Sequence, residues 1–177
     1  LPLVVLLYYK YVRIDEPEIF VKSHRVLCES LGLKGRILVA EEGINGTVVG
    51  EPEATQRYQE TLQTDARFAD MEFKISHGDA STFPKLMVKA RSEIVTLGLE
   101  KDVDPIKETG THLTPEEWKQ VLDKEKDDVV VFDARNRYES DVGYFEGAIK
   151  PDIENFRDLP QVVDEYAHLK DKKVLMY

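Results

Sequence analysis

Hydrophobic and polar residues follow two different rhythms along the first half of the chain. Residues 4–12 are rich in β-branched and aromatic side chains, which predicts a strand. Apolar side chains then recur at helical spacing, and Gly32 closes the predicted helix; these side chains are Ile19, Phe20, Leu27, Cys28 and Leu31. Residues 36–40 and 46–49 predict two more strands, and the turn-rich connection 41–45 predicts a hairpin between them.

The pattern that follows completes a recognisable order of elements. Residues 52–62 predict a second helix, and residues 71–76 and 86–90 predict strands, with a short addition at 94–97. The order is strand, helix, strand, strand, helix, strand. This is the split βαβ, ferredoxin-like arrangement, in which two helices pack on one face of an antiparallel sheet.

Residues 99–111 show no periodicity, and we predict a linker there, between a domain at 1–98 and a second module at 112–177. The distribution of charge agrees with this division. The formal net charge is −10, but residues 1–98 hold 12 basic and 14 acidic side chains, whereas residues 99–177 hold 12 and 20. Most of the acidity belongs to the second module, which leaves the first domain free to present a local basic face.

The second module begins with a helix signal. Thr114 and Glu117 have the spacing of a capping box, with Pro115 at the first helical position, so we expect a helix to about residue 124. The continuous apolar run 129–132 is typical of a parallel strand buried on both faces. Further along, the sequence predicts a helix at 159–169 and another buried strand from residue 173.

The composition narrows the class of protein. With 42% hydrophobic and 33% charged residues the chain reads as an ordinary globular protein, and no apolar run approaches the ~18 residues of a membrane helix. A single cysteine excludes an internal disulfide framework, and no Cys/His cluster has zinc spacing, so we expect a cytoplasmic protein without a metal site. The net charge argues against a general polyanion binder such as a DNA-binding protein. The chain has no initiator Met, and we expect its true N-terminus to be missing.

A sequence pattern in the second module resembles the rhodanese domain. Asp133-x-Arg135 stands at the end of a predicted strand, Glu139 follows four residues later, and residues 143–148 read Gly-Tyr-Phe-Glu-Gly-Ala. Tyr and Phe in this last segment replace the more common His and Ile. Ligands of open α/β sheets bind beyond the carboxyl ends of strands, where the first two residues lie. We expect the three charged residues to be a scaffold held by ion pairs and hydrogen bonds, not reacting groups.

The rhodanese resemblance implies where the reacting group is. In that family a cysteine, held as a thiolate by backbone N–H groups, follows the strand represented here by residues 174–177. That cysteine is not in this sequence, so the catalytic residue is unknown here and the chain alone is expected to be inactive. Cys28 lies on the apolar side of a predicted helix and is expected to fill the core.

A sequence segment in the first domain resembles a more narrowly defined family. Residues 32–47, which read GLKGRILVAEEGINGT, are very similar to the signature of the bacterial rhodanese-domain tRNA uridine hydroxylases, whose N-terminal module is acylphosphatase-like. The resemblance implies an α+β ferredoxin-like (acylphosphatase-like) domain followed by the first part of an α/β rhodanese domain. It further implies oxygen-dependent 5-hydroxylation of the wobble uridine of tRNA anticodons, with molecular oxygen as co-substrate and no other evident cofactor.

Several side chains of the first domain are candidates for contact with the anticodon arm. Lys34, Arg36 and Asn45 can meet phosphate or a base edge, although a plain hairpin with solvated charges explains them equally well. The polar loop 77–85 and the residues after it supply a second set of candidates: Lys85, Lys89 and Arg91. The alternative interpretation is that this segment is a plain connecting loop. For base stacking the sequence leaves five aromatic residues open: Tyr8, Tyr9, Tyr11, Phe73 and Phe83.

Other functions stay open. A rhodanese-type protein can also be a persulfide-based sulfurtransferase or a non-catalytic interaction module. An acylphosphatase-type hydrolase would use Arg13 and Asn45, but the acidic, proline-containing loop 14–17 suits no anion. Glu41 and Glu42 are expected to be solvated acids. Solvated or capping roles are also expected for the histidines, which lack ligand spacing: His24, His77, His112 and His168.

Overall fold

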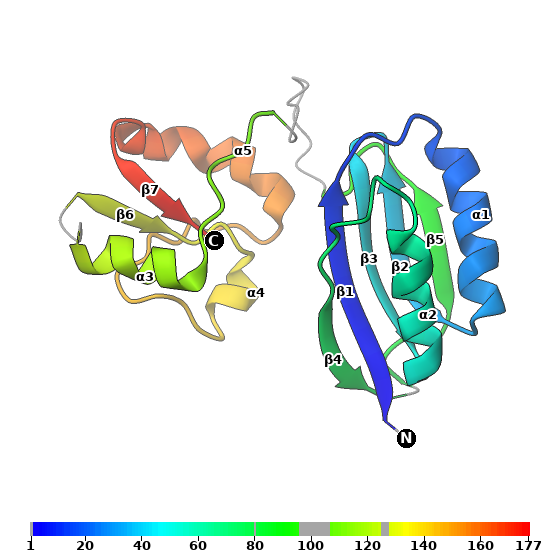
Figure 1. The fold of residues 1–177 in the computed structure, drawn as a ribbon. Coiled ribbons are helices and arrows are strands. Elements are labelled where there is room, and N and C mark those ends of the chain that lie inside the picture. The colour runs from blue at the N-terminus through cyan, green and yellow to red at the C-terminus, as the bar shows by residue number, and fades with distance from the viewer. Residues whose placement is uncertain (1, 80, 96–106, 125–127) are drawn as a thin grey trace. The chain divides into compact units, whose positions relative to one another are not determined.

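The computed structural model describes residues 2–79, 81–95, 107–124 and 128–177. The chain divides into two compact units, one that reaches Val95 and one that runs from Thr109 to Tyr177 (Figure 1). The predicted linker falls largely on residues outside the described ranges, so the boundaries at 98 and 112 stay predictions. Each unit is described by itself.

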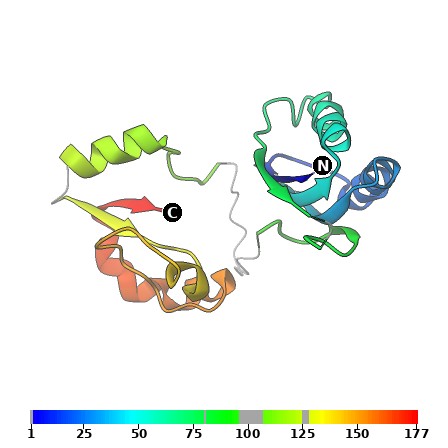
Figure 2. The same cartoon turned by 90° about the horizontal axis from the view of Figure 1, so that it is seen from below.

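The first unit has the predicted order of elements. They are β1 (Leu3–Tyr11), α1 (Pro17–Ser30), β2 (Lys34–Ala40), β3 (Gly43–Gly50), α2 (Pro52–Gln63), β4 (Lys74–Gly78) and β5 (Leu86–Ala90). The sheet order is β4-β1-β3-β2-β5, antiparallel except for the parallel pair of β2 and β5. The first four strands have the ferredoxin-like order, and β5 extends the sheet beside β2. Both helices cover one face of this sheet (Figure 2).

Strand alternation separates the two faces of the sheet. Toward the helices, Leu6, Ile37 and Val48 are fully buried in the main hydrophobic core. The other face, called the open face below, carries the odd-numbered residues of β1, β3 and β5 and the even-numbered residues of β2. Leu7 and Tyr9 of β1 remain 45% and 53% exposed there.

Some predictions for the first unit are wrong in detail. β3 begins at Gly43, so the hairpin turn is shorter than predicted. β4 begins at Lys74, and Met71, predicted as its start, is buried ahead of it. The predicted addition at 94–97 is not a strand at Ile94 and Val95, where the chain bends, and its last two residues lie outside the described ranges. The Ile94 N–H donates to the Glu42 carboxylate over 2.7 Å, which replaces a ladder hydrogen bond.

The second unit is built on a short parallel sheet. Its elements are α3 (Pro115–Lys124), β6 (Val129–Phe132), α4 (Arg137–Ser140), α5 (Leu159–Val162) and β7 (Lys173–Met176), with 3-10 helices at Phe156–Asp158 and Val163–Leu169. β6 and β7 pair in parallel, as the apolar run predicted. The predicted helix at 159–169 is wrong in type, since only its first turn is α-helical. Among the described residues no helix combines the length and apolar character needed to cross a membrane.

The predicted capping box at the start of α3 is confirmed. The Thr114 N–H donates to the Glu117 carboxylate over 2.8 Å, and the Glu117 N–H donates to the Thr114 hydroxyl over 3.2 Å. The predicted burial of β6 holds for its second half only, because Val131 and Phe132 are buried whereas the two residues before them are half-buried. A small core gathers under this end of the sheet: Phe132, Ala134, Ile153 and Leu159.

Candidate functional site

Cross-strand register brings the six candidate RNA-binding residues to one side of the first unit's sheet. Asn45 lies opposite Leu38 of β2, which lies opposite Lys89 of β5. Arg36 is two residues before Leu38 in β2, and Lys34 two before that. Lys85 and Arg91 flank β5 at odd positions like Lys89, and both segments pair with β2: the Gly35 N–H donates to the Lys85 carbonyl and the Arg91 N–H to the Val39 carbonyl, over 3.1 and 2.8 Å.

The cations on this side of the sheet are exposed, and most are unpaired. Within the described part of the chain, no ion pair involves the side chains of Lys34, Arg36, Lys85 and Lys89, which are all exposed. By contrast, Lys10 pairs with Asp70, and Arg67 with Asp65 over 2.6 Å. An unpaired cation on an exposed strand can neutralise a phosphate without first giving up an internal partner.

Asn45 differs from the cations because its amide is anchored. Its Nδ2 donates to the Ile94 carbonyl over 3.2 Å, and its side chain is half-buried. The bend after β5, which the sequence misread as a strand, therefore supports this residue. The end of the face next to Asn45, around Tyr11, is acidic: burial raises the pKa of Tyr11, and the nearby carboxylates of Glu42 and Glu93 raise it further.

The structure separates the aromatic candidates that the sequence left open. Tyr8 is buried on the helix side of β1, whereas Tyr9, its neighbour, is 53% exposed on the open face. Tyr11, Phe73 and Phe83 are half-buried, and Phe73 packs against the main core. Alternation along β1 thus leaves Tyr9 as the most exposed of the five rings.

A buried polar chain crosses the core of the first unit, and it overturns the prediction for His24. The His24 ring nitrogen Nε2 lies 2.8 Å from the Tyr58 hydroxyl, which in turn hydrogen-bonds the Tyr8 hydroxyl. His24 is 4% exposed, so it is neither solvated nor a cap, and burial lowers its pKa to about 4. The side chain sits on the core side of α1 because helical spacing puts it in line with the buried Val21 and Cys28, and Phe20, one turn earlier, stacks on its ring.

Cys28 belongs to the same core, as predicted. It is fully buried, and burial raises the pKa of its thiol to about 12. A thiol that stays protonated and lies out of reach of solvent is not a nucleophile. The cysteine of the first unit therefore has a packing role.

In the second unit, the predicted scaffold residues Asp133 and Arg135 form one ion pair at the carboxyl end of β6. The Arg135 guanidinium donates to both carboxylate oxygens of Asp133, over 2.9 and 2.8 Å, and its backbone N–H donates a third hydrogen bond over 3.1 Å. These hydrogen bonds hold the pKa of Asp133 below its ordinary value. The Asp133 side chain is 0% exposed, and Arg135 also donates to the Gly143 carbonyl over 2.7 Å.

Tyr177 joins this network, and sequence reasoning missed it. Its hydroxyl donates to Asp133 over 3.0 Å and accepts from the Phe145 N–H over 3.1 Å. Its ring lies beneath the Arg135 guanidinium, 4.9 Å from the ring centre. The parallel pairing of β6 and β7 could have predicted this contact, because it places the residue after β7 beside the residue after β6.

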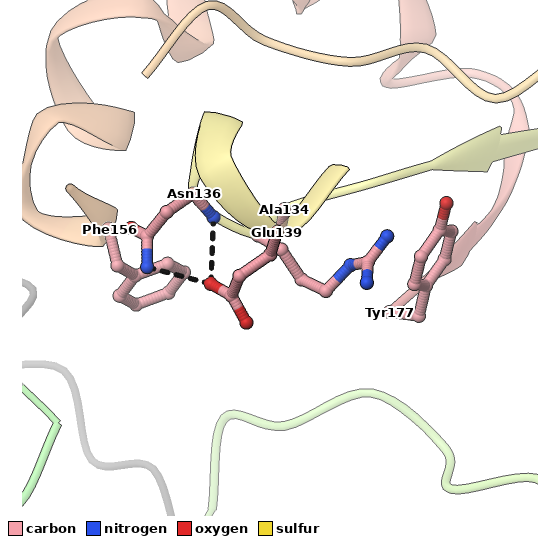
Figure 3. A pocket seen from close by; sticks show the side chains of 6 residues that line it. Ala134, Asn136, Glu139, Phe156 and Tyr177 are labelled. Atoms are coloured by element: carbon pink, nitrogen blue, oxygen red, sulfur yellow. Dashed lines mark hydrogen bonds between the residues drawn. The ribbon is translucent and has the colours of Figure 1, made fainter. Parts of the chain in front are cut away.

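Glu139, the third predicted scaffold residue, does not contact this ion pair. Its carboxylate accepts from the backbone N–H and the side-chain amide of Asn136, over 3.2 and 2.7 Å, and so secures the start of α4 (Figure 3). Glu139 and Arg135 do line one pocket of about 270 Å³; the other lining residues are Ala134, Asn136, Phe156 and Tyr177. Arg135 and Glu139 therefore meet around a pocket that Asp133 does not line, and the three scaffold residues do not form one hydrogen-bonded triad.

The structure gives no support to an acylphosphatase-type anion site. Arg13 pairs with Asp15 over 2.9 Å and with Glu41 over 3.3 Å, so carboxylates surround the guanidinium that would have to bind the anion. Glu42 is half-buried and accepts a backbone hydrogen bond, so the prediction of two solvated acids is confirmed for Glu41 only. Over the described ranges, no three His, Cys, Asp or Glu side chains lie close enough to hold a metal ion.

Comparison with known proteins now decides the family. Residues 3–94 match the family described as the UPF0176 acylphosphatase like domain, which covers the whole ferredoxin-like sheet. The chain belongs to this family. The resemblance of the first domain to an acylphosphatase-like module is thereby confirmed, whereas the match does not extend to the second unit.

Curated relatives match nearly the whole chain. A protein of Listeria monocytogenes named tRNA uridine(34) hydroxylase is 55% identical over 98% of this chain and 54% of its own length. A protein of the same name from Enterococcus faecalis is 53% identical over the same shares. The chain thus spans about half the length of the curated relatives it matches. Among solved structures, a BLUF protein, BlrB, gives a TM-score of 0.46 at 20% identity, covering 71% of this chain and 89% of its own; this likeness is too weak to support an inference.

Proposed function

We propose that this chain is part of an enzyme that hydroxylates carbon 5 of the wobble uridine in tRNA anticodons. Relatives named tRNA uridine(34) hydroxylase, 52–55% identical over 98% of the chain, supply the reaction. The observation that carries the proposal is the gathering of unpaired cations on the open face of a chain whose net charge is −10. Such a local reversal of charge is the expected footprint of a nucleic-acid contact.

In this proposal the first unit binds the anticodon arm. The exposed side chains on its open face neutralise phosphates, and Asn45 stands among them as a polar group able to meet a base. Phosphate contacts fix the position of the RNA but carry no sequence information. The phosphate contacts of the cationic side therefore position the tRNA for the rest of the enzyme and cannot by themselves select the uridine.

The second unit is assigned to the first part of a rhodanese domain. The ion pair of Asp133 and Arg135, fastened by Tyr177, ties together the two strand ends and the loop at Gly143, and this is the edge of an α/β sheet where ligands bind. We place the catalytic cysteine in the part of the whole protein outside this chain, after Tyr177. Because Cys28 is buried and protonated, the 177 residues alone should not catalyse the reaction.

The reaction sets requirements that other groups must meet. Molecular oxygen is the co-substrate: one of its atoms replaces the hydrogen at carbon 5 as a hydroxyl group, and the other leaves as water. Two electrons from a reductant and two protons balance this step. We assign the enzyme to the cytoplasm, where its tRNA substrate is found.

The decisive experiment measures 5-hydroxyuridine by mass spectrometry in tRNA from cells that lack the full-length gene. The full-length protein should restore the modification, and the Arg36→Glu/Lys89→Glu variant should restore little of it. Arg57→Glu, which reverses an exposed cation on α2, on the helix-covered side of the sheet, should behave like the unaltered protein.

Two results would contradict the proposal. If the modification is unchanged without the gene, the reaction is wrong, and thiosulfate:cyanide sulfurtransfer by the full-length protein becomes the next activity to measure. If all variants restore it equally, the open face is not the tRNA surface.

A further inference from the structure

We propose that the open face contains a site for one unstacked uracil base, with Tyr9 as the stacking surface and Oδ1 of Asn45 as acceptor for the base's N3–H. The inference rests on the proposed function, because it names base-recognising residues on the surface assigned to tRNA. It goes beyond phosphate binding, since it makes this surface selective for a base.

Tyr9 has the exposure and the place of a stacking platform. β1 pairs with β3 along its length but with β4 only as far as Leu7, so Tyr9 projects from the open face just past the end of β4, with β3 on one side of it. Its side chain is 53% exposed, and Tyr11 meets it edge-on at 6.3 Å, which restricts the ring. Four-stranded sheets of RNA-binding modules stack splayed-out bases on aromatic rings in such positions.

Asn45 lies directly opposite Tyr9 in the ladder of β1 and β3. Only the amide nitrogen can donate to the Ile94 carbonyl, so this hydrogen bond of 3.2 Å fixes the orientation of the side chain. Oδ1 is left without a hydrogen-bond partner among the described residues. A fixed acceptor selects a base edge with a donor: uracil N3–H fits, whereas the unprotonated N3 of cytosine would place two acceptors against each other.

The charges around this pair favour an RNA strand over a protein partner. The cross-strand row that holds Tyr9 and Asn45 ends at Lys89, and the next row runs from Lys74 of β4 through Leu7 to Arg36. All three cations are exposed, so a strand that crosses the sheet meets a positive charge at both edges. The cations on the β4 and β5 sides can bind the phosphates that flank a base, while the carboxylates of Glu42 and Glu93 beyond Tyr9 keep the strand on the cationic side.

The test titrates the 177-residue chain with a fluorescent pentanucleotide RNA that has one central uridine, and with the same RNA carrying 3-methyluridine there. Tyr9→Ala should weaken binding of the first RNA roughly five-fold to a hundred-fold, and Tyr9→Phe should change it less than about two-fold. The unaltered chain should bind the 3-methyluridine RNA about two- to ten-fold more weakly than the uridine RNA, and the Asn45→Ala variant should bind the two RNAs with equal affinity. Ile75→Ala, an exposed apolar residue (62%) on the opposite face of β4, is the matched control.

Each outcome separates this site from the proposed function. Equal binding of the two RNAs by the unaltered chain, or binding untouched by Tyr9→Ala, would overturn the base site and leave phosphate binding intact. No binding at all would overturn the site as well, because both residues lie within this chain. If binding depends on both residues while cells lacking the gene keep 5-hydroxyuridine, the base site stands and the proposed reaction fails.

Discussion

At the scale of single residues, Gly46 shows how tightly the core of the first unit is fitted. A Cβ atom at this position would lie 2.3 Å from both Cζ and the hydroxyl oxygen of Tyr8. The Tyr8 ring cannot move aside freely, because its hydroxyl bonds Tyr58 and its ring packs on Phe73 at 5.2 Å. We expect Gly46→Ala to lower the free energy of unfolding of this unit by about 1–3 kcal/mol.

Urea unfolding followed by amide exchange of β3 measures this cost. Gly110→Ala provides the control, because a Cβ atom there has no neighbour within 4 Å. Equal stability of the two variants would show that the Tyr8 ring yields to the methyl group.

His24 predicts how the stability of the first unit depends on pH. Its pKa is about 4 when folded, against an ordinary value of 6.5, so between these values the unfolded chain binds more protons than the folded one. Stability should therefore be full above pH 6.5 and decline as the pH falls toward 4, by about 3 kcal/mol in all. His24→Gln, which keeps a hydrogen-bonding group, should flatten this decline.

The free energy of unfolding at pH 7.0, 5.5 and 4.5 checks this expectation. His77→Gln removes an exposed histidine from the same unit and should leave the pH dependence unchanged. A decline that persists in His24→Gln would assign it to other groups.

At the scale of elements, the sequence predicted what local patterns control. The capping box placed the start of α3, and the β-branched and aromatic residues of 4–12 placed β1. The sequence-based prediction failed where contacts between distant residues decide whether a side chain is buried. His24 has a polar side chain, yet two tyrosines from other elements make its burial favourable. The bend at Ile94 was misread because its partners, Glu42 and Asn45, lie about fifty residues away.

The same limit applies to the strand ends of the second unit, where Tyr177 joins the two predicted charges in one hydrogen-bonded network. Asp133→Asn would remove the charge that holds Arg135 and accepts from Tyr177, so we expect it to destabilise this unit by about 1–3 kcal/mol. Trp118, the chain's only tryptophan, packs 6.2 Å from the Tyr177 ring and reports unfolding by its fluorescence.

Asp123→Asn is the comparison for this substitution. Asp123 pairs with Lys119, one helical turn away, and both side chains are exposed, so the free energy of unfolding should fall by no more than about 0.5 kcal/mol. Equal midpoints in urea for the two variants would mean that the strand-end network adds nothing to stability.

At the scale of the whole molecule, the distribution of charge shows a feature that no single residue reveals. The sequence predicted a basic face in the first domain from the uneven spread of charge, but it could not say that six separate candidates share one side of a sheet. That follows from the register of β3 with β2 and of β2 with β5, the second of which pairs residues about fifty positions apart. A parallel strand added at the edge is not foreseeable from a four-strand pattern.

This arrangement predicts how salt affects RNA binding. A phosphate contact releases counterions, so for a single strand each lost contact should reduce the slope of log K against log salt by about 0.7. Arg36→Gln should therefore lower the slope by that amount, whereas Arg57→Gln, on the helix-covered side of the sheet, should leave it unchanged. Both variants change the net charge equally, so any difference between them reports position. Identical slopes, measured by anisotropy between about 50 and 200 mM salt, would mean that RNA is attracted by overall charge alone, which a chain with a net charge of −10 cannot provide.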